Sequence, residues 1–194
     1  MALAGIVAFF PFMLFLTVLV KSTSEGPAFF AQERSGVGGR PFTIYKYRTM
    51  YVGAEKDKEK FRHLNVKDGP AFKIPDDPRL TNVGRILSQT FLDELPQLFN
   101  ILRGDMSFVG PRPPTPDEVE HYEGWQARRL DVKGGLTSPW VIQGMHRLSF
   151  DEWMRSDLAY IQNMNILTDL EIIFKTVFLV VKVVFKTVKE AFAG

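Results

Sequence analysis

The chain carries apolar residues at its two ends and charged residues between them. Leu3 to Val20 contains no charged residue and would form a helix about 27 Å long, close to the length that crosses a bilayer. Pro11 lies in the middle of this run, where it removes a backbone donor and frees the carbonyl of Val7, so the helix should bend. A bent helix can enter and leave a membrane on one side. Residues 1–21 are therefore predicted to form a re-entrant membrane helix.

Two alternatives exist for the same run. No basic residue precedes it and no small-residue cleavage site follows it, which argues against a signal peptide. A bent helix that spans the membrane stays open, because proline is tolerated in such helices. The run starts almost at Met1, which also leaves open that the chain is a piece of a longer protein.

The C-terminal end predicts a second membrane-associated element. Residues 166–194 contain a long helical pattern whose lysines are spaced 7, 4 and 3 residues apart and so share one narrow stripe: Lys175, Lys182, Lys186 and Lys189. The other faces are apolar. This pattern favours an amphipathic helix at the surface of an anionic membrane over a core helix with one solvated stripe.

The polar segment 22–165 is predicted to be a single cytosolic domain. Ala28–Arg34 and Phe42–Tyr47 flank a glycine-rich turn and indicate a β-hairpin. Glu55–His63 has the pattern of a solvated helix, and Asn82–Leu102 that of a helix interrupted near Pro96. The expected fold class is α+β, mostly helical, in one small domain.

Composition excludes several kinds of site. The net charge of +2 is too small to indicate a nucleic-acid partner. The absence of cysteine excludes disulfide bonds and zinc–thiolate sites, and agrees with a domain that faces the cytosol. The sequence contains neither G-x-x-x-x-G-K nor G-x-G-x-x-G, so nucleotide binding would need another device.

Adjacent carboxylates between apolar residues are the strongest candidate for chemistry. Asp93 and Glu94 near a low-dielectric surface cannot both ionise easily, so their pKa values should be pushed apart. Such a pair suits one nucleophile or metal ligand beside one proton acceptor. If Asp93 lies near a helix start, backbone N–H groups should lower its pKa and keep it ionised. The alternative is an acidic helix start with no chemistry.

Several motifs around this pair resemble one family in the same order along the chain. They are Lys46-Tyr47-Arg48-Thr49-Met50, Asp77-Pro78-Arg79-Leu80-Thr81, Asp93-Glu94-Leu95-Pro96-Gln97, Gly104-Asp105-Met106-Ser107 and Val109-Gly110-Pro111-Arg112-Pro113. Together they resemble the bacterial sugar transferases, the monotopic polyprenyl-phosphate phosphoglycosyl transferases, from about Gly26 to Thr176. The stretch Phe150–Trp153 is most similar to the catalytic domain of the larger, often hexose-specific members.

The resemblance implies a reaction and its partners. A sugar-1-phosphate would move from a UDP-sugar to undecaprenyl phosphate, releasing UMP, as the first membrane step in making an exopolysaccharide, lipopolysaccharide or capsule. Asp93 would form a covalent phosphosugar intermediate, Glu94 would assist, and Asp93 with Asp105 would hold Mg²⁺. The enzyme would lie at the inner membrane with its catalytic domain on the cytosolic face, and a homodimer is left open. For Asp105, a cap on the turn after Gly104 is the alternative.

The resemblance also assigns further residues. A nucleotide contact is implied for the rigid segment Pro111, Arg112 and Pro113. Phosphate contacts are expected from Lys46, Arg48, Arg79 and Arg147, whereas Asp157 and Tyr160 match a family pattern without a stated role. The alternative for Lys46 and Arg48 is that they are surface cations of the hairpin. The alternative for Arg79 is a structural pairing with Asp77.

The chain departs from the family pattern at several positions. Ser88 and Met145 stand where the family usually has arginines, and Gly134 and Ser138 replace a proline and a glycine of one loop. Losing two cations would weaken diphosphate binding, unless His146, Arg147 or Arg85 replaces them. The competing hypothesis is therefore a catalytically impaired homologue that binds nucleotide-sugar or lipid phosphate in an assembly. Retention of Asp93, Glu94 and Arg112 together favours the enzyme.

Overall fold

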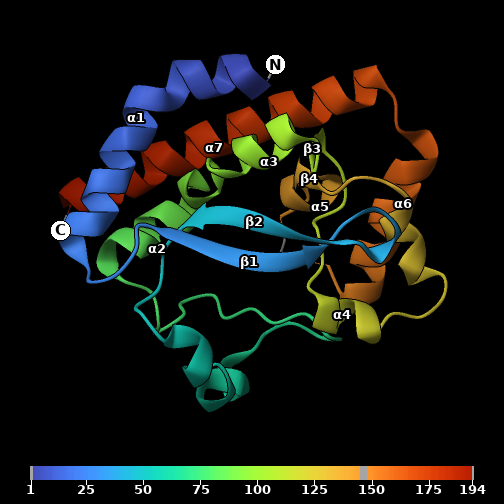
Figure 1. Cartoon of the computed structure of the whole chain (residues 1–194), viewed down its shortest axis with the longest axis horizontal. Coiled ribbons are helices and arrows are strands. Elements are labelled where there is room, and N and C mark those ends of the chain that lie inside the picture. The colour runs from blue at the N-terminus through green and yellow to red at the C-terminus, as the bar shows by residue number, and fades with distance from the viewer. Residues whose placement is uncertain (1, 145–147, 194) are drawn as a thin grey trace.

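The structure, a computed structural model, describes residues 2–144 and 148–193 and is mostly helical with two small sheets (Figure 1). This architecture confirms the predicted mostly helical fold of one small domain. The helices are α1 (Ala2–Thr23), α2 (Asn82–Gln89), α3 (Gln97–Arg103), α4 (Pro116–Glu120), α5 (Pro139–Ile142), α6 (Phe150–Asn163) and α7 (Ile166–Ala193). The strands are β1 (Phe29–Ser35), β2 (Pro41–Tyr47), β3 (Ser107–Val109) and β4 (Gly135–Thr137).

The predicted hairpin is formed by β1 and β2, which pair antiparallel from Phe29 opposite Tyr47 to Ser35 opposite Pro41. Gly38 and Gly39 in the turn have φ angles of +63° and +76°, a region that side chains disfavour. Asn100 of α3 binds the hairpin through its amide: Nδ2 donates to the Thr43 carbonyl at 2.7 Å, and Oδ1 accepts from Tyr45 N at 3.3 Å. The hairpin is thus fixed to α3, which follows the acidic pair.

Helix α1 contains Pro11 and changes direction along its length, as Figure 1 shows. Its inner side packs on the domain, where the Tyr47 hydroxyl donates to the Met13 carbonyl at 2.7 Å and Leu16 joins a cluster with Tyr47 and Leu87. Its outer side exposes large apolar residues: Leu3, Val7, Phe10, Leu14, Phe15 and Val18. Among the described residues, α1 is the one helix that is both long enough and apolar enough to cross a membrane.

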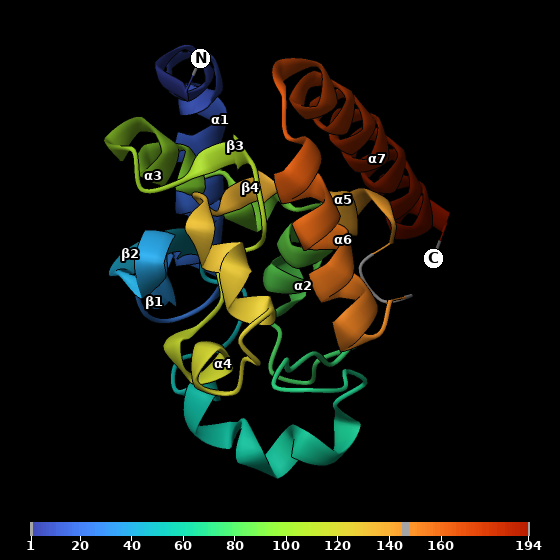
Figure 2. The same ribbon diagram turned by 90° about the vertical axis from the view of Figure 1, so that its right-hand side faces the viewer.

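Helix α7 exposes a second apolar face. Ile172 is buried, and Thr176 Oγ1 lies 2.6 Å from Thr137 Oγ1 of β4, so one side of α7 packs on the domain. The exposed large residues of the other sides are Ile166, Leu167, Phe174, Val177, Phe178 and Phe185. Both views place α1 and α7 along the same end of the molecule (Figures 1 and 2). That end therefore presents a wide apolar surface.

Two predicted helices differ in detail. The charged segment expected to be one helix forms two 3₁₀ helices, η2 (Ala54–Asp57) and η3 (Glu59–Leu64), because it has few apolar side chains to pack as a regular face. The segment 82–102 breaks earlier than Pro96: α2 ends at Gln89, and Phe91 has a φ of +60°. A 3₁₀ turn, η4 (Leu92–Glu94), then separates α2 from α3 and carries both carboxylates.

The parallel pair β3 and β4 brings two loops together. Ser107 lies opposite Gly135, and Val109 opposite Thr137. A Cβ on Gly135 would lie 2.1 Å from Gly110 N, so only glycine allows the two backbones to approach this closely. The segment Pro111–Pro113 follows β3, and α5 follows β4. The pairing of the two strands therefore brings Pro111–Pro113 and the start of α5 together.

We predict that Gly84→Ala destabilises the fold. A Cβ at Gly84 would lie 1.8 Å from the Thr49 carbonyl oxygen, so α2 must move away from the end of the hairpin. We expect a loss of about 1–3 kcal/mol in the free energy of unfolding, measured by chemical denaturation in detergent. Gly124→Ala is the control, since no atom of the surrounding fold lies within 4 Å of the place its methyl group would take. Equal stability of the two variants would contradict the prediction.

Candidate active site

One cavity of about 820 Å³ joins the acidic pair to the apolar end of the molecule. This volume is in the range of small-molecule sites. Its polar wall includes Asp93 and Glu94 with a group of cations, and its apolar wall is formed by α1 and α7 through Phe9, Phe12, Ile173, Val177, Val180 and Val181. The cavity can therefore accept a molecule that is charged at one end and apolar at the other.

The unusual backbone at Phe91 sets the position of the acidic pair. A phenylalanine with a φ of +60° costs free energy, and such residues concentrate at functional sites. Thr90 ends α2 with its hydroxyl donating to the Ile86 carbonyl at 2.7 Å, and Phe91 then reverses the chain into η4. Asp93 and Glu94 follow at once, and both line the cavity.

The pKa values of the pair are pushed apart, as predicted, but in an unexpected order. Burial raises the pKa of Asp93 to about 7, with Lys46 opposing the change and the Glu94 charge adding to it. Burial also acts to raise the pKa of Glu94, but Lys46, whose Nζ lies 2.6 Å from Glu94 Oε1, outweighs it and the pKa is lowered. The prediction of a lowered pKa for Asp93 is wrong, because burial outweighs the backbone contribution.

Cations outnumber carboxylates in the cavity wall. Among the described residues that line it, five are cationic and three acidic: Arg34, Lys46, Lys67, Lys73 and Arg112 against Asp93, Glu94 and Glu118. Burial, together with the nearby charge of Arg112, lowers the pKa of Lys73 to about 8. The sequence reasoning missed Arg34, Lys67 and Lys73. Lys73 had a usable signal, as a single cation in the apolar stretch Ala71–Ile74.

Two expected phosphate contacts are held elsewhere in the fold. Arg48 donates to the carbonyls of Pro27 (2.6 Å) and Ser24 (3.0 Å), in the loop that follows α1. Arg79 is buried and binds Asp77 through Nε at 2.9 Å and Nη2 at 2.7 Å. Neither lines the cavity, so the geometry favours the structural alternative for Arg79 and gives Arg48 a structural role as well.

Arg112 is positioned by a buried network. Its side chain lines the cavity, 3.6 Å from Glu118, and its carbonyl accepts from Arg129 at 3.2 Å. Arg129 in turn forms a buried ion pair with Asp157 at 2.7 Å. Asp157 thus acts on the site through Arg129. The neighbouring Pro113 carbonyl accepts from Arg34 Nη1 at 3.1 Å, which fixes the other side of the same segment.

Asp105 is not brought to Asp93. Asn100 Nδ2 donates to Asp105 at 3.4 Å, and Asp105 is absent from the cavity wall. No group of three or more His, Cys, Asp or Glu side chains suited to a metal occurs within the described residues. Asp93 and Glu94 are adjacent carboxylates in the cavity wall, whereas the third, Glu118, is paired with Arg112. Asp93 and Glu94 fit Mg²⁺, which is commonly held by one or two carboxylates together with substrate phosphates.

Of the two positions where the family usually has arginine, the structure describes one, Ser88. Ser88 lines the cavity, whereas Arg85 pairs with Asp76 at 3.2 Å. Met145 and the predicted substitutes His146 and Arg147 lie outside the described residues. Arg34 and Lys73 line the same cavity as Ser88.

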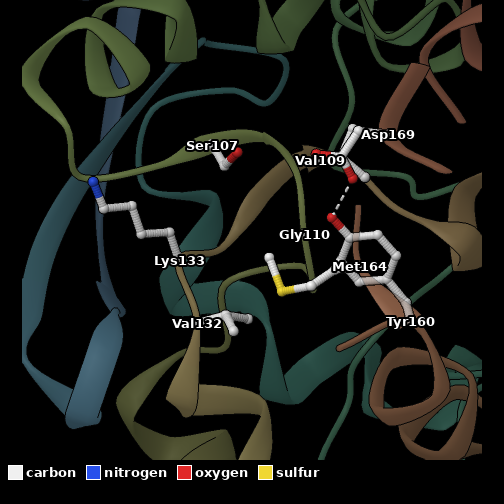
Figure 3. A pocket seen from close by; sticks show the side chains of 8 residues that line it. All are labelled: Ser107, Val109, Gly110, Val132, Lys133, Tyr160, Met164 and Asp169. Atoms are coloured by element: carbon white, nitrogen blue, oxygen red, sulfur yellow. Dashed lines mark hydrogen bonds between the residues drawn. The ribbon is translucent and has the colours of Figure 1, made fainter. Parts of the chain in front are cut away.

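A smaller cavity of about 180 Å³ lies between β3, α6 and the start of α7 (Figure 3). In it the Tyr160 hydroxyl donates to Asp169 Oδ1 at 2.7 Å, which ties α6 to α7. Burial and the Asp169 partner raise the pKa of Tyr160, so the phenol stays neutral. Lys133 points away from this pair in Figure 3. The role of Tyr160 is therefore to join two helices.

The acidic pair, with Asp93 buried and Glu94 half-buried, thus lies in a cavity that is cationic on one side and continues into an apolar surface on the other. The model of the family described as bacterial sugar transferase matches residues 1–183, so the chain belongs to this family.

Similar proteins include the galactosyl transferase CpsE of Streptococcus agalactiae, 44% identical over 90% of this chain and 38% of that protein. The exopolysaccharide production protein ExoY of Sinorhizobium fredii is 39% identical over 91% of this chain and 80% of that protein. The UDP-glucose:undecaprenyl-phosphate glucose-1-phosphate transferase of Caulobacter vibrioides is 39% identical over 87% of this chain and 62% of that protein. The chain thus spans well under half of CpsE but most of ExoY.

We predict that Asp93→Asn stabilises the protein at high pH. A carboxyl whose pKa is raised on folding stabilises the fold below its unfolded value of about 4, and this stabilisation is lost as pH rises through about 7. The gain in free energy of unfolding should be about 2–3 kcal/mol larger at pH 8 than at pH 5, measured by denaturant titration. Asp131→Asn, at an exposed position, should show no such difference. A pH-independent effect of Asp93→Asn would contradict the assigned burial.

We also predict that Asp157→Asn costs about 3–5 kcal/mol of stability, because it leaves the Arg129 charge buried without its partner. The matched control is Glu59→Gln, which breaks the exposed pair with Arg62 and should change stability little. Thermal unfolding in detergent compares the two. If both variants unfold like the wild type, Asp157 does not hold Arg129 and Arg112 in place.

Proposed function

We propose that this protein transfers a sugar-1-phosphate from a UDP-sugar to undecaprenyl phosphate and releases UMP. The observation that carries the proposal is the Asp93–Glu94 pair, buried at Asp93 and half-buried at Glu94, which lies in a cationic cavity whose opposite wall is the apolar surface of α1 and α7. The names of the relatives support it, since they include transfer of glucose-1-phosphate and production of exopolysaccharide.

The charges of the cavity suit a diphosphate. Among the described wall residues, cations exceed carboxylates by two when both members of the pair are ionised, and the diphosphate of a UDP-sugar carries two negative charges. Arg112, held between prolines and by Arg129, gives the nucleotide end a fixed guanidinium. Lys46 and Lys73 supply ammonium groups near the pair. These cations compensate for the serine at position 88.

Asp93 is the nucleophile in this proposal. In its ionised form, an Asp93 oxygen forms a bond to the β-phosphorus, and the bond from that phosphorus to the bridging oxygen breaks, so UMP leaves with the oxygen. A phosphate oxygen of undecaprenyl phosphate then attacks the same phosphorus, and the Asp93–phosphorus bond breaks. Glu94, kept ionised by Lys46, orients the incoming phosphate and accepts its proton when that oxygen is protonated.

Mg²⁺, held by Asp93 and Glu94 with substrate oxygens, would neutralise the diphosphate. Asp105 has no part in this arrangement because it does not face the cavity. Without the metal, the cations of the wall still bind the substrate, but they leave the charge that develops on UMP less well stabilised.

The apolar wall explains the membrane seat. An undecaprenyl chain cannot leave the bilayer, so its phosphate must be met at headgroup level. The proposal places the exposed faces of α1 and α7 in the membrane interface, with α1 re-entrant at Pro11 and the domain on the cytosolic face of the inner membrane. The exposed Lys175 and Lys182 would then meet anionic headgroups.

The test is UMP release by detergent-solubilised protein given undecaprenyl phosphate, Mg²⁺ and a panel of UDP-sugars. We expect release with one sugar and a loss of at least a thousandfold for Asp93→Asn, since the nucleophile is removed. Asp131→Asn should keep full activity. A well-folded wild type that releases UMP from no sugar would refute the proposal and favour the impaired homologue.

The same assay predicts a pH profile. Because the pKa of Asp93 is about 7, kcat/KM should fall about tenfold per pH unit below that value and level off above it. The rate levels off near neutral pH because burial raises the pKa of Asp93. A rate that stays constant between pH 5 and 8 would show that ionised Asp93 is not required.

A further inference from the structure

The end of the cavity next to α5 contains buried donors that the acidic pair and the cations do not use. Ser138 Oγ and Trp140 Nε1 are buried and have no hydrogen-bond partner among the described residues. Both side chains line the cavity. Unpaired buried donors are rare because they cost free energy, and among the described wall residues Trp153 Nε1 and Arg34 Nε are two more. Such a group of donors on one wall indicates a ligand that accepts hydrogen bonds.

The hydroxyl of Ser138 is left over by the local structure. Ser138 is the N-cap of α5, the position at which a serine usually accepts a hydrogen bond from a backbone N–H of the first turn. Its side chain makes no such bond, and Pro139 follows it as the first helical residue.

Trp140 is held rigidly. Its ring stacks on Trp153 with centroids 4.4 Å apart and an angle of 18°, and Phe150 meets Trp153 edge-on at 89°. On Trp153 also lies the guanidinium of Arg129, 4.9 Å from the ring centroid. This ladder fixes the indole N–H at one place on the wall, which is the condition for discriminating between positions of a ligand atom.

We propose that Ser138 and Trp140 form a subsite for the hexosyl group of the nucleotide-sugar and help to decide which hexose is accepted. The proposal rests on the function proposed above. In that function Arg112 and the lysines take the nucleotide and the diphosphate, so the sugar is the part of the donor substrate still without partners.

The two groups suit sugar hydroxyls. An indole N–H only donates, whereas a serine hydroxyl donates and accepts, and a ring hydroxyl can satisfy both. A polyprenyl chain offers them no acceptor. A site that hydrogen-bonds one sugar hydroxyl rejects the epimeric hexose, whose hydroxyl points in another direction, because the buried protein groups are then left unpaired.

The experiment measures binding rather than turnover. Isothermal titration of the Asp93→Asn protein with UDP-glucose, UDP-galactose and UMP gives the dissociation constants without formation of a covalent intermediate. Ser138→Ala removes one donor and keeps the packing, whereas Trp140→Phe removes the other donor and keeps an aromatic ring against Trp153 at the cost of some buried volume. We expect each to raise the Kd of the preferred UDP-hexose about threefold to tenfold and to narrow the difference between the two hexoses. The Kd of UMP should change less than twofold.

Two control variants are matched to these changes. Ser107→Ala removes a hydroxyl from the smaller cavity of Figure 3. Trp125→Phe removes an indole N–H that donates to Glu123, from a ring that packs on the cluster of Trp140 and Trp153 but does not itself line the large cavity. Neither should alter the Kd of either hexose. If Trp140→Phe unfolds, Ser138→Ala and Ser138→Gly decide the question alone.

Three results would overturn the subsite: unchanged Kd values in the variants, equal weakening of UMP and UDP-hexose, or a parent protein that binds neither UDP-hexose. Equal weakening would assign the two donors to the nucleotide. Failure of the proposed function is distinguishable from these, because a wild type that binds UDP-hexose but releases no UMP refutes the transferase alone. A wild type that transfers sugar, with variants of unaltered affinity, refutes the subsite alone.

Discussion

The site depends on holding two adjacent carboxylates, one buried and one half-buried, beside one ammonium group. Burial makes ionisation of both costly, and Lys46 at 2.6 Å directs the negative charge to Glu94. Asp93 therefore ionises near neutral pH rather than near pH 4. A nucleophile with such a pKa is more basic than an exposed aspartate yet still available at neutral pH, and as a leaving group it still departs more readily than an alkoxide.

The rest of the fold holds the groups around this pair. Asn100 binds the backbone of β2, so the strand that carries Lys46 and the helix that follows Glu94 move together. On the other side, Asp157 and Arg129 fix the carbonyl of Arg112. The close approach of Gly110 and Gly135 brings the segment of Arg112 next to the start of α5. Cationic and hydrogen-bonding walls thus come from segments far apart in the sequence.

The sequence predicted what local pattern determines: the hairpin, the interrupted helix around the acidic pair, and the two apolar terminal helices. It did not reveal the positions of guanidinium groups, because Arg48 and Arg79 have the same spacing signals whether they face a ligand or a carbonyl. The pKa of Asp93 was also beyond it, since burial depends on α1 and on loop residues distant in sequence. Lys73 was overlooked for a similar reason: the loop 65–75 has no regular periodicity, and only folding brings it to the cavity.

The hydrogen bond from the Tyr47 hydroxyl to the Met13 carbonyl has a mechanical consequence. Tyr47 is the residue next to Lys46, so the apolar helix and the ammonium group that partners Glu94 share one rigid connection. If α1 floats in the lipid at a depth set by its apolar length, that connection sets the height of Lys46 above the hydrocarbon. The depth of α1 in the lipid would then place the reactive groups at the level of the lipid phosphates.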